Sequence, residues 1–167
     1  MKIAPPFWLD TSSLVEAHRR KYRNKAHEFW GLLSSKIAEG SVCSPLQVYE
    51  ELLKGEAGDH LIKFGKSRPG MQIFGNRAVQ DAYRVVTGHI AATYEAKKWS
   101  EFLGGGDAWV IAFAMSLGGT VVTEESSSRK KKIRIPVVCG DLVVSFTDIA
   151  GMLNYFGNPL GKGQAAL

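Results

Sequence analysis

The chain has 167 residues, 45% of them hydrophobic, which is enough for one well-filled core and little more. No window approaches the roughly 18 uninterrupted apolar residues of a membrane span, and the N-terminal segment has no hydrophobic stretch of signal-peptide length. We therefore expect one soluble, cytoplasmic domain. Cys43 and Cys139 lie far apart and have no histidine at metal spacing, which favours two buried thiols over a disulfide or a zinc site.

The chain is moderately basic, with 21 Lys and Arg residues against 16 Asp and Glu residues and a net charge of +5. Much of the positive charge lies in two runs, HRRKYRNK at residues 18–25 and SRKKKIR at residues 128–134. Such runs bind phosphate backbones, although they are also typical of solvated faces and exposed loops. The position of the acidic residues relative to these runs decides between the two interpretations.

The first half of the chain predicts two strands, each followed by a helix. The apolar run at residues 7–9 follows two prolines and indicates a buried parallel strand, which enters a helix that Thr11, Ser12 or Ser13 caps. Apolar spacing over residues 24–40 predicts an amphipathic helix. A second strand at 41–43 precedes a helix with Ser44 as N-cap and Gln47 completing a capping box.

The second half continues the alternation. Residues 56–100 are predicted to be helical with breaks, and a buried helix begins at Asp107 after three glycines and ends before Gly118. The segment at 120–123 is a third buried strand, a further strand is expected at about 142–145, and a closing helix from about 147. This pattern predicts an α/β fold with a parallel sheet. We expect a single domain over residues 1–157 and a frayed tail at 158–167.

Acidic residues follow two of the predicted strands. Asp10 ends the first strand, and Glu124 and Glu125 follow TVVT; the carboxyl ends of parallel strands form the edge where ligands bind. Asp107 begins the helix that leads into the TVVT strand, so it is expected at the same edge, and Glu51 lies beside the buried face of its helix. Carboxylates gathered there repel one another unless a cation neutralises them, and hard oxygen ligands select Mg²⁺ or Mn²⁺.

Simpler interpretations remain for these residues. Asp10 alone is compatible with a helix cap or a structural charge, and a helical glutamate such as Glu51 is usually solvated. The hydroxyl residues after Asp10 are as compatible with capping as with a role in the site. Other aromatic and imidazole side chains receive no chemical role, because Trp8, Trp30 and Trp109 have the spacing of core residues and the histidines share no helical face.

The sequence resembles the PIN-domain family, and within it the PIN-like group that includes DUF4411 and is similar to VapC-type toxins. The resemblance covers nearly the whole chain; its most specific parts are D-T-S after the first strand, the V-x-x-E-L helix, and D-x-x-x-I-A-x-A followed by V-V-T-x-E. It implies a three-layer α/β/α sandwich with a short, mainly parallel sheet. The family's four acids match Asp10, Glu51, Asp107 and Glu125, with Glu124 as a substitute for the last; many PIN domains have Asp at that position.

The resemblance implies a metal-dependent endoribonuclease that hydrolyses RNA phosphodiester bonds and is the toxin of a type II toxin-antitoxin pair. The four acids are expected to bind Mg²⁺ or Mn²⁺ directly or through water, and Thr11, Ser12 and Thr123 to orient them by hydrogen bonds. The expected RNA-binding residues are Arg19, Arg20, Lys21, Lys130, Lys131 and Lys132. The expected partners are RNA, a cognate antitoxin protein and a second copy of the chain.

Two alternatives stay open. A PIN-like module that scarcely cleaves and instead binds RNA or another protein has the same sequence pattern. A nuclease of the same fold that acts on DNA is also compatible, because no feature of the sequence reports on contact with the 2′-hydroxyl.

Overall fold

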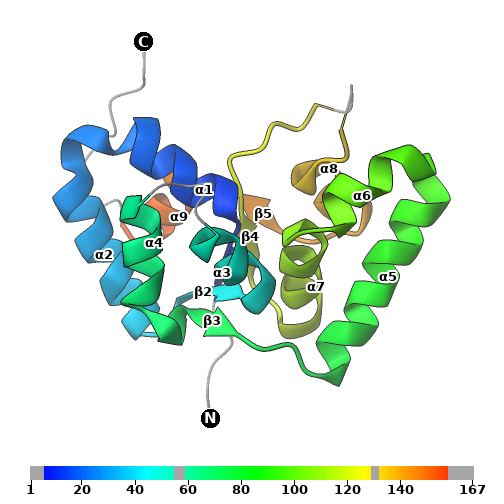
Figure 1. Ribbon diagram of the computed structural model, residues 1–167, viewed down its shortest axis with the longest axis horizontal. Coiled ribbons are helices and arrows are strands. Elements are labelled where there is room, and N and C mark those ends of the chain that lie inside the picture. Colours follow the sequence, from blue (N-terminus) through cyan, green and yellow to red (C-terminus); the bar gives the residue numbers. More distant parts are fainter. Residues whose placement is uncertain (1–5, 55–58, 129–131, 158–167) are drawn as a thin grey trace.

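The fold is built on a parallel β-sheet. The computed structural model describes residues 6–54, 59–128 and 132–157, and these contain a five-stranded sheet (Figure 1). The strand order is β3-β2-β1-β4-β5, and every neighbouring pair is parallel. The strands are β1 (Phe7–Leu9), β2 (Val42–Pro45), β3 (Gln72–Ile73), β4 (Thr120–Val122) and β5 (Phe146–Thr147). The predicted α/β class with a parallel sheet is confirmed.

Helices connect the strands. Within the described ranges they are α1 (Thr11–Glu16), α2 (Ala26–Ala38), α3 (Leu46–Leu53), α4 (Asp59–Lys66), α5 (Arg77–Thr93), α6 (Trp99–Leu103), α7 (Asp107–Leu117), α8 (Ile135–Asp141) and α9 (Ile149–Tyr155). Short turns are the π-helical η1 (Ala17–Lys21), which continues α1, and the 3₁₀ turns η2 (Arg23–Lys25), η3 (Pro69–Met71) and η4 (Ala96–Lys98). None of the helices described has the length and apolar character needed to cross a bilayer.

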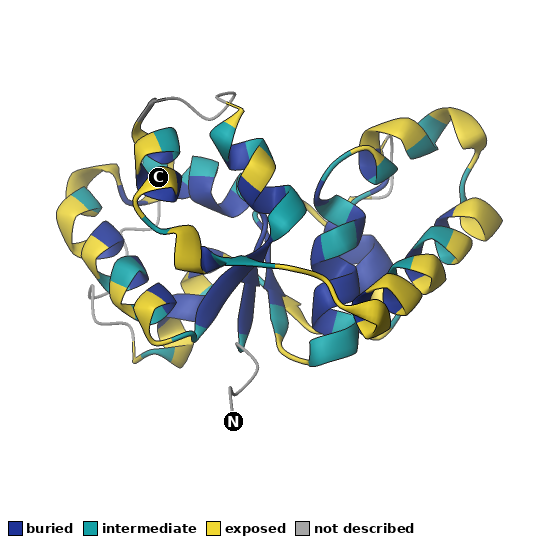
Figure 2. Cartoon of the chain, turned by 60° about the horizontal axis from the view of Figure 1, so that its bottom comes forward, coloured by how far each residue is buried: buried dark blue, intermediate teal, exposed yellow. Residues whose placement is uncertain are grey.

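The two faces of the sheet are covered by different sets of helices. Successive side chains of a strand point to opposite faces, so Phe7 and Leu9 pack with α1, α2, α4 and α9, whereas Trp8 packs with α5, α6, α7 and α8. Figure 2 shows the buried strands between helices whose outer surfaces are exposed. The result is a three-layer α/β/α sandwich, as the resemblance implied.

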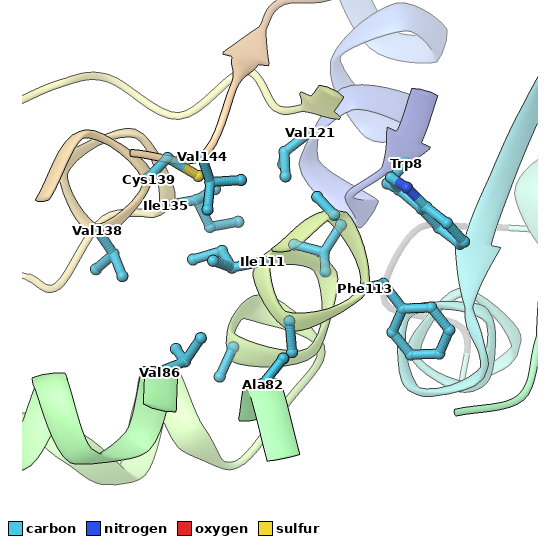
Figure 3. Close-up of a cluster of buried hydrophobic side chains, with 14 of the residues drawn as sticks. Trp8, Ala82, Val86, Ile111, Phe113, Val121, Ile135, Val138, Cys139 and Val144 are labelled. Carbon is cyan, nitrogen blue, oxygen red and sulfur yellow. The ribbon is translucent and has the colours of Figure 1, made fainter. Parts of the chain in front are cut away.

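Helix α7 is the central element of the second core. Its residues from Ala108 to Ala114 are apolar on every side and nearly all buried, so it has no solvated face of its own. Figure 3 shows Ile111 among side chains from α5 and α8, and Phe113 beside Trp8 of β1, with ring centroids 5.1 Å apart. Burying such side chains stabilises the fold by about 1.5–3 kcal/mol each. This packing also fixes the position of the first residue of α7, Asp107.

The strand order reverses next to β1. From β1 the chain moves outward to β2 and β3, and then returns to place β4 on the other side of β1, with β5 beyond it. The connections on the two sides of β1 therefore leave in opposite directions, which opens a crevice at the carboxyl ends of β1 and β4. Asp10 follows β1, and Thr123, Glu124 and Glu125 follow β4.

Several local predictions are wrong. Strand β3 lies within residues 56–100, which were predicted to be helical with breaks. Ser44 is not an N-cap: it lies in β2, its hydroxyl donates to the carbonyl of Leu9 (3.3 Å), and α3 begins after Pro45. The expected strand at 142–145 is instead β5 at Phe146–Thr147, because Val143 is 92% exposed and has a φ of +57°, which a strand does not tolerate. Helix α8 was not predicted, since its β-branched residues are buried and not periodic.

Three predicted helices and the predicted state of the cysteines are confirmed. The predicted helices at 24–40 and 107–117 and the closing helix are present as α2, α7 and α9. Cys43 and Cys139 are both buried thiols. The expected frayed tail at 158–167 lies outside the described residues.

Candidate active site

Asp10 lies at the centre of the candidate site. It is 3% exposed, and its backbone amide donates to the carbonyl of Val122 (3.0 Å), which extends the β1–β4 pairing by one residue. Its Oδ2 accepts hydrogen bonds from the hydroxyls of Ser12 (2.6 Å) and Thr123 (3.2 Å). The expected capping of α1 by Thr11, Ser12 or Ser13 is wrong, because the N-cap is Asp10. The hydroxyls of Thr11 and Ser12 donate to carboxylates, and that of Ser13 donates to the backbone carbonyl of Asp10 (2.6 Å).

Glu51 connects α3 to the loop before α7. Its Oε2 accepts a hydrogen bond from the hydroxyl of Thr11 (3.0 Å), and its Oε1 accepts one from the backbone amide of Gly106 (2.7 Å). This close approach requires glycine, because a Cβ at Gly105 would collide with Glu51 Oε1 and one at Gly106 would lie 2.5 Å from a methyl group of Val48. The three-glycine run therefore lets α3 and the start of α7 lie close together.

The two glutamates after β4 point in different directions. Glu124 accepts a hydrogen bond from the backbone amide of Ile149 (2.9 Å) at the start of α9 and another from the ammonium of Lys21 (2.7 Å). Glu125 accepts from the amide of Ile135 (2.8 Å) at the start of α8 and lies 3.7 Å from Arg134. Of these two glutamates, only Glu125 is among the charges that raise the pKa of Asp10 and of Asp107.

The four acids Asp10, Glu51, Asp107 and Glu125, called the acidic cluster below, interact through their charges. The pKa of Asp10 is raised to about 6: burial is the largest cause, the charges of Glu125 and Glu51 also raise it, and the Ser12 and Thr123 hydrogen bonds lower it. The pKa of Asp107 is raised to about 9, first by burial and then by repulsion from Asp10, Glu125, Glu51 and Glu101. Acids from four separate segments therefore act on one another through their charges, and their mutual repulsion favours the protonated form of Asp107 at neutral pH.

The cluster does not form a closed metal cage. Over the ranges that the structure describes, no three His, Cys, Asp or Glu residues converge as a preformed set of ligands. Glu51 and Glu125 are instead directed at backbone amides, which leaves Asp10 and Asp107 as the acids without such a bond. This donor set fits Mg²⁺, which is usually held by one or two carboxylates together with water and substrate phosphates.

Of the described basic residues predicted to bind RNA, Lys132 lines a pocket together with Asp107 and Glu125, and Arg19, Arg20 and Lys21 are not among the residues that line it. Arg19 and Arg20 are exposed, and Arg20 lies 3.9 Å from Glu16 of its own helix. Lys21 is paired with Glu124 and lies 3.9 Å from Asp148, so it joins η1 to the end of β4 and the start of α9. Lys130 and Lys131 lie outside the described residues, and Lys132 is paired with Glu101.

A polar pocket of about 250 Å³ adjoins the cluster. Asp107 and Glu125 line it together with residues of η4 and α6 and with residues 132–134, which precede α8. Figure 1 shows α6 and α8 near the end of α7 where Asp107 begins the helix. Its basic lining residues are Lys97, Lys98, Lys132 and Arg134. The sequence analysis missed Lys97 and Lys98, because two lysines next to a tryptophan do not form a charge run; their position just before the GGGD segment was the available signal.

Comparison with known proteins gives a family. The model of the family described as "Domain of unknown function (DUF4411)" matches residues 7–157, which include all four acids of the cluster. No match was found among curated proteins. Since the family match extends from the first residue of β1 to the end of the described part of the chain, the protein belongs to the DUF4411 family.

Proposed function

We propose that the protein is a metal-dependent endoribonuclease of the PIN-like type, acting as the toxin of a type II toxin-antitoxin pair. The observation that carries the proposal is that Asp10, Glu51, Asp107 and Glu125, from four separate segments, lie close enough for their charges to act on one another near the switch point of a parallel sheet. Buried acids that raise one another's pKa are costly for stability, so a functional reason for keeping them is expected. The resemblance of the surrounding motifs to PIN domains supplies the reaction class.

Each acid has a separate task in this proposal. Asp10 and Asp107 hold Mg²⁺, with Mn²⁺ as a substitute, since their oxygens are not directed at backbone amides. Glu51 positions Asp107 through Gly106, and Glu125 adds negative charge from the end of β4. When bound, the ion supplies positive charge that activates a water and stabilises charge on the attacked phosphate. Ser12 and Thr123 hold Asp10 in one orientation.

The test is cleavage of labelled RNA by purified protein with Mg²⁺ or with chelator, comparing the wild type with Asp10→Asn and Asp107→Asn. Asp81→Asn is the matched control, because Asp81 is an exposed residue of α5 that undergoes the same change of charge. We expect cleavage with Mg²⁺ by the wild type and the control only. Cleavage that persists in chelator, or that the two cluster variants retain at full rate, would contradict the proposal.

The biological role and the substrate have their own measurements. Expression of the wild type, but not of Asp107→Asn, should arrest bacterial growth, and co-expression of a neighbouring antitoxin gene should relieve the arrest. Single-stranded DNA of the same sequence, offered beside the RNA, distinguishes a ribonuclease from a DNA-directed nuclease. Growth that continues despite production of an active nuclease would contradict the toxin role alone.

A second candidate is a PIN-like module that binds RNA or protein and scarcely cleaves. The observation in its favour is that Glu51 and Glu125 bind backbone amides, and that no closed set of three metal ligands is present in the described segments. It predicts tight RNA binding in chelator, no cleavage at any Mg²⁺ or Mn²⁺ concentration, and no loss of binding in Asp10→Asn.

A further inference from the structure

The pocket beside the acidic cluster contains an unusual lysine. Lys98 ends η4 and is partly buried in the pocket wall, and it takes part in no ion pair within the described residues. The other three cations of the pocket are already engaged: Lys97 lies 2.8 Å from Glu95, Lys132 is paired with Glu101, and Arg134 lies 3.7 Å from Glu125. A partly buried ammonium without a counter-ion is suited to bind an anion from outside the protein.

The position of the pocket indicates which anion it binds. Asp107 and Glu125 form one wall, so a molecule in the pocket also faces the acidic cluster. A carboxylate ligand would gain nothing there beyond the contact with Lys98 and would be repelled by the acids. A phosphodiester strand differs, because one phosphate can bind the lysine in the absence of metal while the following phosphates extend along the chain, and the next one comes to lie over the cluster when a metal ion is bound there.

The size of the pocket is consistent with this interpretation. Its volume of about 250 Å³ lies just below the roughly 300–1,000 Å³ of sites that enclose whole small ligands. The pocket is therefore suited to a short piece of a longer chain rather than to a complete ligand. The cations Lys132 and Arg134 also line the pocket and come from a different part of the chain than Lys98.

We propose that this pocket binds the backbone of the substrate strand, with the Lys98 ammonium on a phosphate beside the one that is cleaved. The proposal rests on the nuclease function above and specifies the path of the strand. That path runs between α6 and the segment before α8. It does not follow the Arg19–Lys21 run, where Lys21 is held by Glu124.

The test measures binding of a fluorescein-labelled single-stranded RNA decamer by anisotropy, in chelator, between 50 and 200 mM salt. Lys98→Gln should weaken binding about tenfold, the loss expected for one charge-assisted contact. It should also reduce the slope of log affinity against log salt by about 0.7. Lys98→Arg keeps the charge and should bind within about threefold of the wild type, which shows that the site tolerates substitution.

Lys66→Gln is the matched control, because it removes the same charge from an exposed position on α4, over the other face of the sheet. Thermal melting of each variant checks that it is folded. Equal loss of affinity in Lys66→Gln and Lys98→Gln would overturn the proposal, since only overall charge would then matter. Binding by the wild type that Lys98→Gln leaves unchanged would also overturn it.

Cleavage assays separate this inference from the proposed function. Mg²⁺-dependent cleavage with an unchanged KM in Lys98→Gln would overturn the strand path and leave the nuclease proposal intact. Binding that depends on Lys98, without cleavage under any metal condition, would support the pocket and overturn hydrolysis. A raised KM in Lys98→Gln, with the KM of Lys66→Gln unchanged, would support both the strand path and the nuclease proposal.

Discussion

Glu51 Oε1 accepts a 2.7 Å hydrogen bond from the backbone amide of Gly106, the residue immediately before Asp107. One acid of the cluster therefore fixes the loop that presents another. The same carboxylate accepts from Thr11, the residue after Asp10, through its second oxygen (3.0 Å). Glu51 thus lies between the two acids to which we assign the metal, and it contacts the neighbour of each.

Glu51→Gln and Glu51→Ala should have different consequences. Both remove the negative charge, but glutamine keeps an oxygen that accepts from the Gly106 amide, whereas alanine leaves this amide without its partner. We expect Glu51→Ala to be less stable than Glu51→Gln by about 1–3 kcal/mol, the cost of an unsatisfied buried donor. Urea unfolding at one pH measures the difference.

Cleavage by the same two variants tests the positioning role. Glu51→Gln should retain measurable activity, and Glu51→Ala should lose at least a further order of magnitude, mainly in kcat, because misplacement of Asp107 affects the chemical step. Equal activity of the two variants would show that the carboxylate charge matters and the hydrogen bond to Gly106 does not.

Asp107→Asn should stabilise the metal-free protein while abolishing cleavage. The pKa of Asp107 rises from 3.8 to about 9 on folding, so between these pH values the folded protein holds a proton that the unfolded chain has released. The stability from this group is fully present below pH 3.8 and is lost as the pH rises toward 9. The wild type in chelator should therefore lose up to about 1.4 kcal/mol per pH unit from this group, and asparagine should remove that loss.

Denaturant unfolding between pH 6 and pH 8 in chelator measures this effect, since Asp10, with a pKa of about 6, contributes mainly at lower pH. Asp81→Asn should retain the slope of the wild type, because Asp81 is exposed and paired with Arg84. A slope in Asp107→Asn that matches the wild type would place the titration elsewhere. Addition of Mg²⁺ should stabilise the wild type at pH 7 and leave Asp107→Asn unaffected.

Glu124→Gln and Glu125→Gln should separate structure from activity. Glutamine at position 124 still accepts from the Ile149 amide but loses its charge interaction with Lys21, so we expect a destabilisation of about 1 kcal/mol with cleavage retained. Glutamine at position 125 still accepts from the Ile135 amide and removes negative charge facing Asp10 and Asp107. It should lower activity without loss of stability.

The reverse result, with activity lost in Glu124→Gln and retained in Glu125→Gln, would assign the fourth acid to Glu124. Thermal melting and RNA cleavage on the same preparations provide both measurements. Lys21→Gln is a useful companion variant, because it should reproduce the stability loss of Glu124→Gln and leave cleavage intact.

The sequence predicted the elements whose own pattern is strong. Residues 107–117 form a helix because three glycines precede an apolar run that also ends on glycine, and short apolar segments at 7–9 and 120–122 form buried strands. Weaker signals were misread where tertiary packing overrode local preference. Ser44 and Pro45 have the composition of a helix start, yet pairing of Pro45 with Ile73 keeps them in β2.

For the site, the sequence by itself determined which acids follow strands or begin helices, because these positions depend on chain order alone. Only the tertiary structure decided which of them meet. Glu124 and Glu125 are adjacent and chemically equivalent in sequence, but the path of the chain after β4 directs Glu124 to Lys21 and α9, and Glu125 to α8 and the cluster. Likewise Lys98 and Asp107 line one pocket with Lys132 and Arg134, which are far from them in sequence, because α7 packs against both α6 and α8. The positions of these charges depend on strand order and helix packing. Both bring together residues that are far apart in the sequence, and a local sequence pattern contains no information about such contacts.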